Sequence, residues 1–275
     1  MTEIFDNIRK LYRFNTPCEA LVDLIEFFSE SSLDAMDRFI GASPFTVTLF
    51  PSYTPTIWLN LGTSYQLKNG DAWHTVDERT DILLLRNKIV ERRNLPTDNI
   101  FTVKFNPGGF ETIFGISQTT IGSEVIPVED IIPASFIKKL KRLGCFEDRK
   151  VMFENFFLEK LEKNNKREGF YLQCIKETVQ AFTGAGLESA TSELARKLYI
   201  SEKTLYRCFT KVVGTSPKNF QAITRARIAL TSYVANPVVF SPYDHGYYDM
   251  SHFYKSVVKF TGQKLSQYRF TSQQR

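Results

Sequence analysis

The sequence has few residues of the kinds that bind metals or form disulfides. Its 275 residues include only four cysteines and three histidines. The cysteines, Cys18, Cys145, Cys174 and Cys208, are widely separated, without the Cys-x-x-Cys spacing of zinc and dithiol sites, so we expect buried thiols. His74 is the only histidine before residue 245, which leaves no histidine cluster in the N-terminal part. We therefore predict neither a bound metal nor a cofactor.

Long hydrophobic runs and catalytic motifs are also missing. No segment approaches the ~20 apolar residues of a membrane helix, and the first residues lack the layout of a signal peptide. These features predict a cytoplasmic protein that does not contact a membrane. There is no Gly-x-Ser-x-Gly turn, no Gly-Lys-Ser/Thr phosphate loop and no Cys-His pair in the N-terminal part. We predict that the chain is not an enzyme and has no catalytic residues.

The most informative feature present is an internal repeat at an offset of 48 residues. Leu205 pairs with Phe253, Arg207 with Lys255, and Gly214 with Gly262. So many matches at one offset indicate two copies of one structural unit. The helical period places one apolar face in each copy, and these faces are predicted to be buried. They consist of Leu205, Phe209 and Val212 in the first copy and of Phe253, Val257 and Phe260 in the second.

The opposite face of each predicted helix is rich in cationic and hydrogen-bonding groups. Such a stripe is typical of a recognition helix in the major groove of DNA. Ser201 and Asp249 precede the two helices as predicted N-caps. An ion pair with Glu202 is the alternative for Arg207, and a purely structural role is the alternative for His252. The predicted DNA-binding residues are Lys203, Tyr206, Arg207, Thr210, Ser251, His252, Tyr254 and Lys255.

The positive charge is concentrated in the part of the chain that contains the repeat. Residues 166–275 hold 16 Lys and Arg against 7 Asp and Glu, a net charge of +9. Residues 1–165 hold 19 against 23, a net charge of −4. Because neutralisation of phosphates supplies much of the affinity for DNA, only the C-terminal part is expected to bind double-stranded DNA.

The repeat resembles the DNA-binding domain of the AraC/XylS family of bacterial transcription regulators. The first half carries Leu194-Ala195, Ser201, Leu205-Tyr206-Arg207-Cys208-Phe209 and Gly214-Thr215-Ser216-Pro217. The second half carries residues 246–255, which read Gly-Tyr-Tyr-Asp-Met-Ser-His-Phe-Tyr-Lys, followed by Gly262. The resemblance implies seven helices in two helix-turn-helix halves, joined by a long helix near residues 217–235. It also implies a transcription activator with RNA polymerase as a partner.

The second half departs from the family pattern at two places. Ser241-Pro242 stands where the family has an Ile-Ala pair, and Val257 replaces a phenylalanine. Because proline disrupts a helix interior, we expect a shortened helix with Ser241 as its cap and Pro242 at its first position. The second half is therefore predicted to be the weaker reader of DNA.

The N-terminal part shows a pattern of short strands. Apolar or alternating runs at residues 45–50, 56–61, 81–86 and 99–105 are separated by turn residues, as in a sandwich or barrel. The segment 19–28 fits either a helix or a strand, and residues 136–164 have a helical pattern. Residues 103–110, 114–115 and 125–130 resemble part of the cupin-like sensing domain of AraC-type regulators.

We therefore predict an α+β fold with two domains. Residues 1–135 form the cupin-like sensing domain, 136–165 a helical linker with residues 151–161 as the candidate dimerisation segment, and 166–275 the DNA-binding domain. A small-molecule effector is expected in the β-rich domain, with Trp58, Tyr65, Trp73 and Phe105 as candidate contacts, although such aromatics also serve as core. The charge break and the polar residues 163–167 predict few contacts across the boundary.

Two other classes remain open at this point. One is an enzyme fused to a DNA-binding domain, of the alkyl-transfer repair type, which needs a reactive cysteine. The other is a DNA-binding accessory protein whose N-terminal domain only associates with itself. Reactivity of the thiols and binding of metabolites distinguish these two classes from a ligand-responsive regulator.

Overall fold

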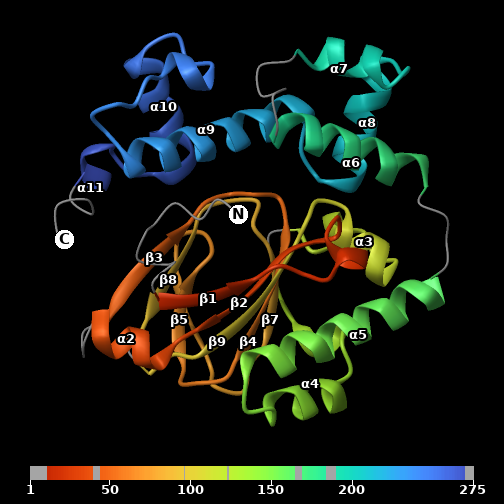
Figure 1. Ribbon diagram of the computed structural model, residues 1–275, viewed down its shortest axis with the longest axis vertical. Coiled ribbons are helices and arrows are strands. Elements are labelled where there is room, and N and C mark those ends of the chain that lie inside the picture. Colours follow the sequence, from red (N-terminus) through yellow and green to blue (C-terminus); the bar gives the residue numbers. More distant parts are fainter. Residues whose placement is uncertain are drawn as a thin grey trace.

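The computed structural model describes residues 11–39, 44–95, 97–122, 124–164, 169–183 and 190–269. A β-rich domain is followed by a helical one, which confirms the predicted α+β class (Figure 1). The strands are β1 (Tyr12–Asn15), β2 (Ile25–Ser31), β3 (Phe45–Leu49), β4 (Pro55–Asn60), β5 (Tyr65–Lys68), β6 (Trp73–Val76), β7 (Ile82–Leu85), β8 (Val90–Asn94), β9 (Ile100–Phe105) and β10 (Val125–Pro127). The helices of the N-terminal part are η1 (Glu19–Leu21), α2 (Leu33–Phe39), α3 (Gly109–Phe114), η2 (Gln118–Thr120), η3 (Val128–Asp130), α4 (Ala134–Lys141) and α5 (Phe146–Asn164).

The strands form two antiparallel sheets. One has six strands in the order β1-β2-β9-β4-β7-β10, and the other has four in the order β3-β8-β5-β6. The four predicted strands correspond to β3, β4, β7 and β9. The ambiguous segment 19–28 contains both a short 3-10 helix, η1, and the start of β2. The linker residues 165–167 lie outside the described residues.

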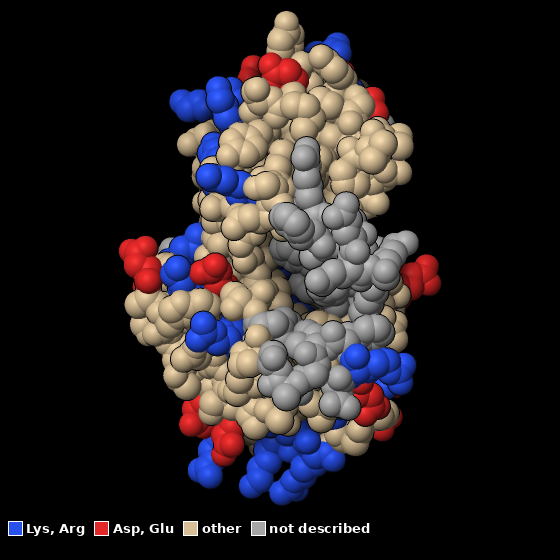
Figure 2. All heavy atoms as spheres, turned by 90° about the vertical axis from the view of Figure 1, so that its left-hand side faces the viewer, with Lys and Arg blue, Asp and Glu red and all other residues tan. Residues whose placement is uncertain are grey.

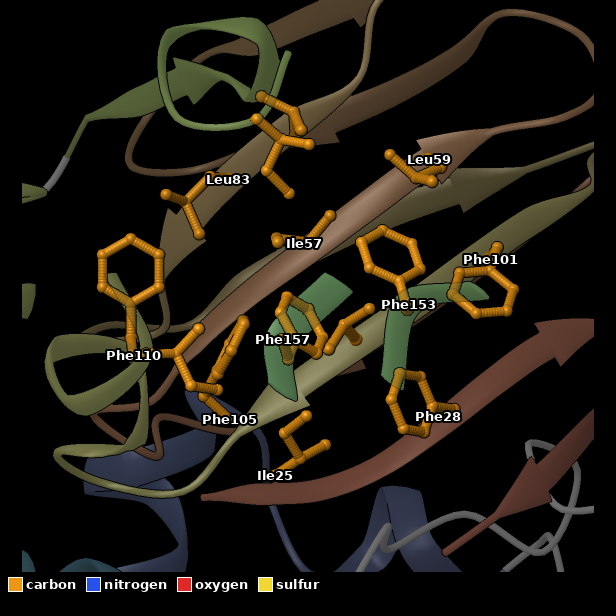
Figure 3. Packing of buried hydrophobic residues seen from close by; sticks show 14 of the residues in the cluster. Ile25, Phe28, Ile57, Leu59, Leu83, Phe101, Phe105, Phe110, Phe153 and Phe157 are labelled. Atoms are coloured by element: carbon orange, nitrogen blue, oxygen red, sulfur yellow. The ribbon is translucent and has the colours of Figure 1, made fainter. Parts of the chain in front are cut away.

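Alternation along the strands gives the six-stranded sheet two different faces. In β9, Phe101, Val103 and Phe105 belong to the core beneath the helices, whereas Thr102 and Lys104 point between the two sheets. Helices α3 and α5 supply further phenylalanines to this core, including Phe110, Phe153 and Phe157 (Figure 3). Phe136 of α4 packs against it. The ring of Phe153 stacks on that of Phe101, with centroids 5.6 Å apart and planes at 10°. This core accounts for much of the chain's phenylalanine and fixes the sheet against α5.

Two glycines allow the chain to leave this sheet and start α3. Gly108 has a φ of +83°, in the left-handed region that side chains disfavour. At Gly109 a Cβ atom would lie 2.0 Å from the carbonyl oxygen of Leu24, so no side chain fits. The block at residues 106–109 is thus a tight turn packed against the segment before β2.

The helical domain comprises α6 (Phe170–Thr183), α7 (Thr191–Lys197), α8 (Glu202–Val212), α9 (Pro217–Ala235), η4 (Tyr243–His245), α10 (Met250–Thr261) and α11 (Ser266–Arg269). The long joining helix has the predicted bounds: Ser216 caps α9 by accepting a bond from the amide of Asn219 at 3.1 Å, and Pro217 occupies its first turn. Separate hydrophobic cores form around the two ends of α9. Each core belongs to one helix-turn-helix half. No helix of the described residues is long and apolar enough to cross a membrane.

The prediction of few contacts between the two domains is wrong. Phe50 of the β-rich domain is 4% exposed and belongs to the hydrophobic core of the second half. Glu26 of β2 pairs with Arg227 of α9 at 3.2 Å, and Asp23 pairs with Lys176 of α6 at 2.7 Å. These contacts come from residues far from the boundary in sequence, so charge and polarity near the linker could not reveal them.

Candidate nucleic-acid interface

The first half presents α8 as a capped amphipathic helix. The Ser201 side chain accepts a hydrogen bond from the amide of Thr204 at 3.1 Å, which starts the helix at the predicted position. Four residues of α8 face the core and are almost completely buried: Leu205, Cys208, Phe209 and Val212. This burial leaves the opposite face of α8 turned away from the rest of the domain.

The outward face of α8 carries the predicted DNA-binding residues. Lys203, Tyr206 and Arg207 are exposed, with 55% of the Tyr206 surface accessible. Thr210 is half-buried, and its hydroxyl donates to the backbone carbonyl of Tyr206 at 2.9 Å. The proton of that hydroxyl is therefore engaged within the helix, although its oxygen can still accept a bond. Lys203, Tyr206 and Arg207 form the accessible stripe of the first half.

The second half repeats this arrangement on α10. The carboxylate of Asp249 accepts from the amide of His252 at 2.7 Å and caps the helix. Phe253, Val257 and Phe260 point into the core. The four remaining predicted residues are exposed: Ser251, His252, Tyr254 and Lys255.

His252 combines exposure with a local structural contact. Its ring lies edge-on against Tyr247, with centroids 5.0 Å apart and planes at 78°. The backbone amide of Tyr248 points to its Nδ1 at 3.5 Å, which is long for a hydrogen bond. The structural alternative for His252 therefore has direct support, while its exposed edge remains within reach of a ligand.

The structure at Pro242 differs from the predicted short helix. Pro242 stands at the N-cap instead of the first helical position, and only the single 3-10 turn η4 follows. Phe240 fills the space with its side chain, which stacks on His245 and packs against Phe253 with centroids 4.7 Å apart. Burial lowers the pKa of His245, and this effect outweighs the charge of Asp244, which raises it. The lowered pKa favours the neutral ring. The Val257 substitution leaves that residue fully buried.

Charged side chains are unevenly spread over the surface. In Figure 2, Lys and Arg atoms gather along one edge of the upper, helical domain, beside wide areas without charge. The β-rich domain below shows both signs close together.

Two capped helices with buried inner faces and exposed cationic outer faces define a DNA-binding regulator of the helix-turn-helix class. Residues 194–270 match the helix-turn-helix domain family, and the resemblance to AraC-type regulators is confirmed for this part of the chain. No curated protein matches the chain.

Among solved structures, ToxT from Vibrio cholerae is similar, at 13% identity, with 83% of this chain and 98% of ToxT covered and a TM-score of 0.48. ToxT bound to an unsaturated fatty acid is similar at 14% identity, with 83% of this chain and 95% of ToxT covered and a TM-score of 0.43. The AraC-like transcriptional activator CuxR gives 14% identity, with 82% and 88% covered and a TM-score of 0.31.

A small cavity of about 40 Å³ lies between the two sheets of the β-rich domain. Of the four aromatic residues predicted for a ligand, only Trp58 lines it. Tyr65 is buried beside Trp58, with ring centroids 6.4 Å apart. Phe105 faces the other side of the sheet, in the core under the helices (Figure 3). Trp73 is 39% exposed on β6.

The cavity contains cationic residues that were not predicted as ligand contacts. Arg86, Arg92 and Lys104 all line it and are all buried. The guanidinium of Arg92 lies 4.8 Å from the centre of the Trp58 ring, and its Nε donates to Asn94 at 2.7 Å. Within the described ranges, no carboxylate forms an ion pair with Arg92. One signal was available in the sequence, because Lys104 is a charged residue in the fully buried strand β9.

A chain of ion pairs connects this cavity with the helical domain. The buried ammonium of Lys104 contacts Glu26 at 2.9 Å, and Glu26 in turn contacts Arg227 of α9. Burial raises the pKa of Glu26, but Lys104 and Arg227 outweigh this effect and lower it to about 2. Glu26 is therefore ionised throughout the neutral range.

The expectation of buried thiols is correct for two of the four cysteines and wrong for the other two, because Cys145 is exposed and Cys18 is half-buried. Cys174 and Cys208 are buried in the core of the first half. Burial, together with the neighbouring Cys208, raises the pKa of Cys174 to about 12, so this thiol is protonated and unreactive at neutral pH. The described part of the chain also contains no group of three or more histidine, cysteine or carboxylate side chains able to hold a metal.

Proposed function

We propose that the chain is a sequence-specific, ligand-responsive activator of transcription. The observation that carries this proposal is the pair of capped, exposed and matched helices α8 and α10 in one cationic domain. Each offers a cation at the same position, Arg207 in α8 and Lys255 in α10. The proposed DNA-binding residues are those predicted from the sequence: Lys203, Tyr206, Arg207, Thr210, Ser251, His252, Tyr254 and Lys255.

The length of α9 supports reading of DNA by both halves. Its 19 residues span about 28 Å at ~1.5 Å per residue. Successive major grooves on one side of the duplex are about 34 Å apart. Two recognition helices carried near the ends of α9 can therefore reach neighbouring grooves. We propose a site with two contact patches on one face, separated by one helical turn.

The proposed DNA-binding role is tested by selecting bound duplexes from a random pool with the full chain. Arg207→Ala should weaken specific binding by about 1–3 kcal/mol and relax the base preference at one position. Lys255→Ala should act on the other patch. Lys138→Ala, which removes an exposed cation of α4, is the matched control and should leave binding unchanged. Failure of the wild-type chain to enrich any sequence contradicts the proposed function.

The cavity between the sheets is the proposed effector site. A buried cation is costly unless an anion or strong hydrogen bonds compensate it. Arg92 donates hydrogen bonds to Asn94 and to the Tyr12 hydroxyl and lies over the Trp58 ring, but its nearest carboxylate is the more distant Asp98. An effector with a small acidic group therefore fits. The volume of about 40 Å³ admits such a group but is far below the ~300–1,000 Å³ of sites for larger ligands.

Binding of the effector can be measured by isothermal titration of the full chain with small organic acids and with amides of the same shape. We expect the acids to bind and the amides to fail, and Arg92→Met to abolish binding. Equal binding of acid and amide contradicts the acidic group.

The remaining partners are also proposals. An activator of this family type contacts RNA polymerase in the bacterial cytoplasm, and two copies can associate through α5, where Val151 is 51% exposed. Sedimentation of the wild-type chain and of Val151→Glu tests the second proposal, since a charge at an apolar contact separates the copies.

A further inference from the structure

We propose that the loop between β3 and β4, residues 50–54, is a wedge that fixes the orientation of the two helix-turn-helix halves relative to each other. The wedge thereby sets which spacing between two DNA half-sites the chain accepts. This inference rests on the proposed DNA-binding function. It assigns to the β-rich domain a role in how DNA is read, in addition to binding an effector.

The wedge contacts the second half through Phe50. The side chain of Phe50 is buried in the same core as Val257, and its ring lies 6.3 Å from that of Phe260, in the last turn of α10. A neighbouring contact joins the same two parts, because the side-chain amide of Gln263 donates to the hydroxyl of Thr48 at 3.2 Å. The β-rich domain thus completes the core that supports the second recognition helix.

Tyr53 extends the wedge to the first half. Its side chain packs against the cores of both halves. The Tyr53 backbone has a φ of +51°, a conformation that a bulky residue rarely adopts. Its carbonyl accepts a hydrogen bond from the side-chain amide of Gln118 at 2.9 Å, and the same amide donates to the carbonyl of Val213 at 3.2 Å. Val213 is the C-cap of α8, so the end of the first recognition helix is tied to the loop.

The loop itself is held in one shape by Arg86. The carbonyl of Arg86 accepts from the amides of Ser52 and Tyr53 at 2.8 and 2.9 Å. Its guanidinium donates to the carbonyl of Phe50 at 2.9 Å. A loop held by several bonds behaves as a rigid part instead of a flexible tether. Arg86 and Leu49 also line the cavity between the sheets, so a molecule bound there touches residues that position the wedge.

A third contact prevents the helical domain from rotating about the wedge. Arg227, near the middle of α9, pairs with Glu26 of β2. The β-rich domain therefore contacts the first half, the joining helix and the second half. One such contact would be enough to hold two domains together. Three contacts on different parts of the helical domain also fix the orientation of its two halves relative to each other.

The experiment measures how strictly the spacing of half-sites is read. Half-sites are first identified by selection with the wild-type full chain. Dissociation constants are then measured for duplexes in which the spacer between the half-sites is lengthened or shortened one base pair at a time. For the wild type we expect a single preferred spacing and a loss of about tenfold or more per added base pair, comparable to one mismatched base pair.

Tyr53→Gly is the informative variant. Glycine removes the ring while tolerating the left-handed backbone, so the loop and its backbone hydrogen bonds can persist. We expect this variant to bind a single half-site as the wild type does but to accept neighbouring spacings within about threefold. Tyr53→Phe keeps the ring and is the matched control, which should retain the strict spacing. A second variant, Phe50→Leu, should relax the spacing through the second half.

The outcomes separate the two proposals. If the wild-type chain binds no DNA, the proposed function is wrong and the wedge has nothing to set. If the wild type binds DNA but both Tyr53→Gly and Phe50→Leu keep its spacing profile, the proposed function stands and the wedge is refuted.

Discussion

Replacement of Glu26 by glutamine should destabilise the folded chain by about 3 kcal/mol at neutral pH. The carboxylate of Glu26 contacts Lys104 and Arg227, and together they lower its pKa from 4.5 to about 2. A pKa lowered by one corresponds to about 1.4 kcal/mol, so lowering it from 4.5 to about 2 corresponds to an effect on the order of 3 kcal/mol. In Glu26→Gln, the fully buried ammonium of Lys104 also loses the carboxylate that it contacts.

The same shift fixes how stability depends on pH. Because the folded-state pKa is depressed, the contribution of Glu26 is fully present above about pH 4.5 and is lost as the pH falls towards 2. Urea unfolding of the wild type and of Glu26→Gln is repeated from pH 7 to pH 2. The difference between their free energies of unfolding should become smaller below pH 4.5. Glu124→Gln alters an exposed carboxylate and serves as the control, with an expected change near zero.

A double-mutant cycle strengthens this test. Glu26→Gln combined with Lys104→Met removes both charges, so it should cost less than the sum of the two single changes. The reasoning is refuted if Glu26→Gln costs less than about 1 kcal/mol at pH 7 and its pH profile parallels that of the wild type.

Three further changes have defined outcomes. Gly109→Ala should lower the melting temperature, because its Cβ would lie 2.0 Å from the Leu24 carbonyl oxygen, and an unchanged melting curve contradicts that geometry. Phe253→Ala should cost about 3–5 kcal/mol in unfolding experiments and erase the second contact patch in a footprint, while retention of both patches refutes the assignment of α10. Lys203→Ala should reduce the slope of log K against log salt by about 0.9, and an unchanged slope excludes a phosphate contact.

The periodicity of the sequence predicted the helical domain well. The caps Ser201 and Asp249 and the apolar faces of α8 and α10 are local features, set by spacing within one helix. The bounds of α9 follow in the same way from Ser216 and Pro217. Residues that act within a few positions of one another leave a direct trace in sequence, so they could be identified without the structure.

The cavity and the domain interface could not be predicted in this way. Lys104 and Glu26 lie on different strands, and their pairing depends on sheet register, including the bulge between Ile25 and Phe27 in β2. Phe105 and Trp58 are both aromatic strand residues, yet the alternation of their strands places them on opposite faces of the sheet. Phe50 resembled a core residue of its own domain, although its side chain is buried in the other one.

The position of Phe50 also bears on how the chain folds during synthesis. A ribosome releases the N-terminal part first, and domains generally fold as units in that order. The β-rich domain can thus present Phe50 and Tyr53 before α9 and α10 have been made. The second half, with its single 3-10 turn after Pro242, then condenses on a surface that already exists. In this order of events the β-rich domain acts as a template, and the second half, which is synthesised after it, is the part that most needs it.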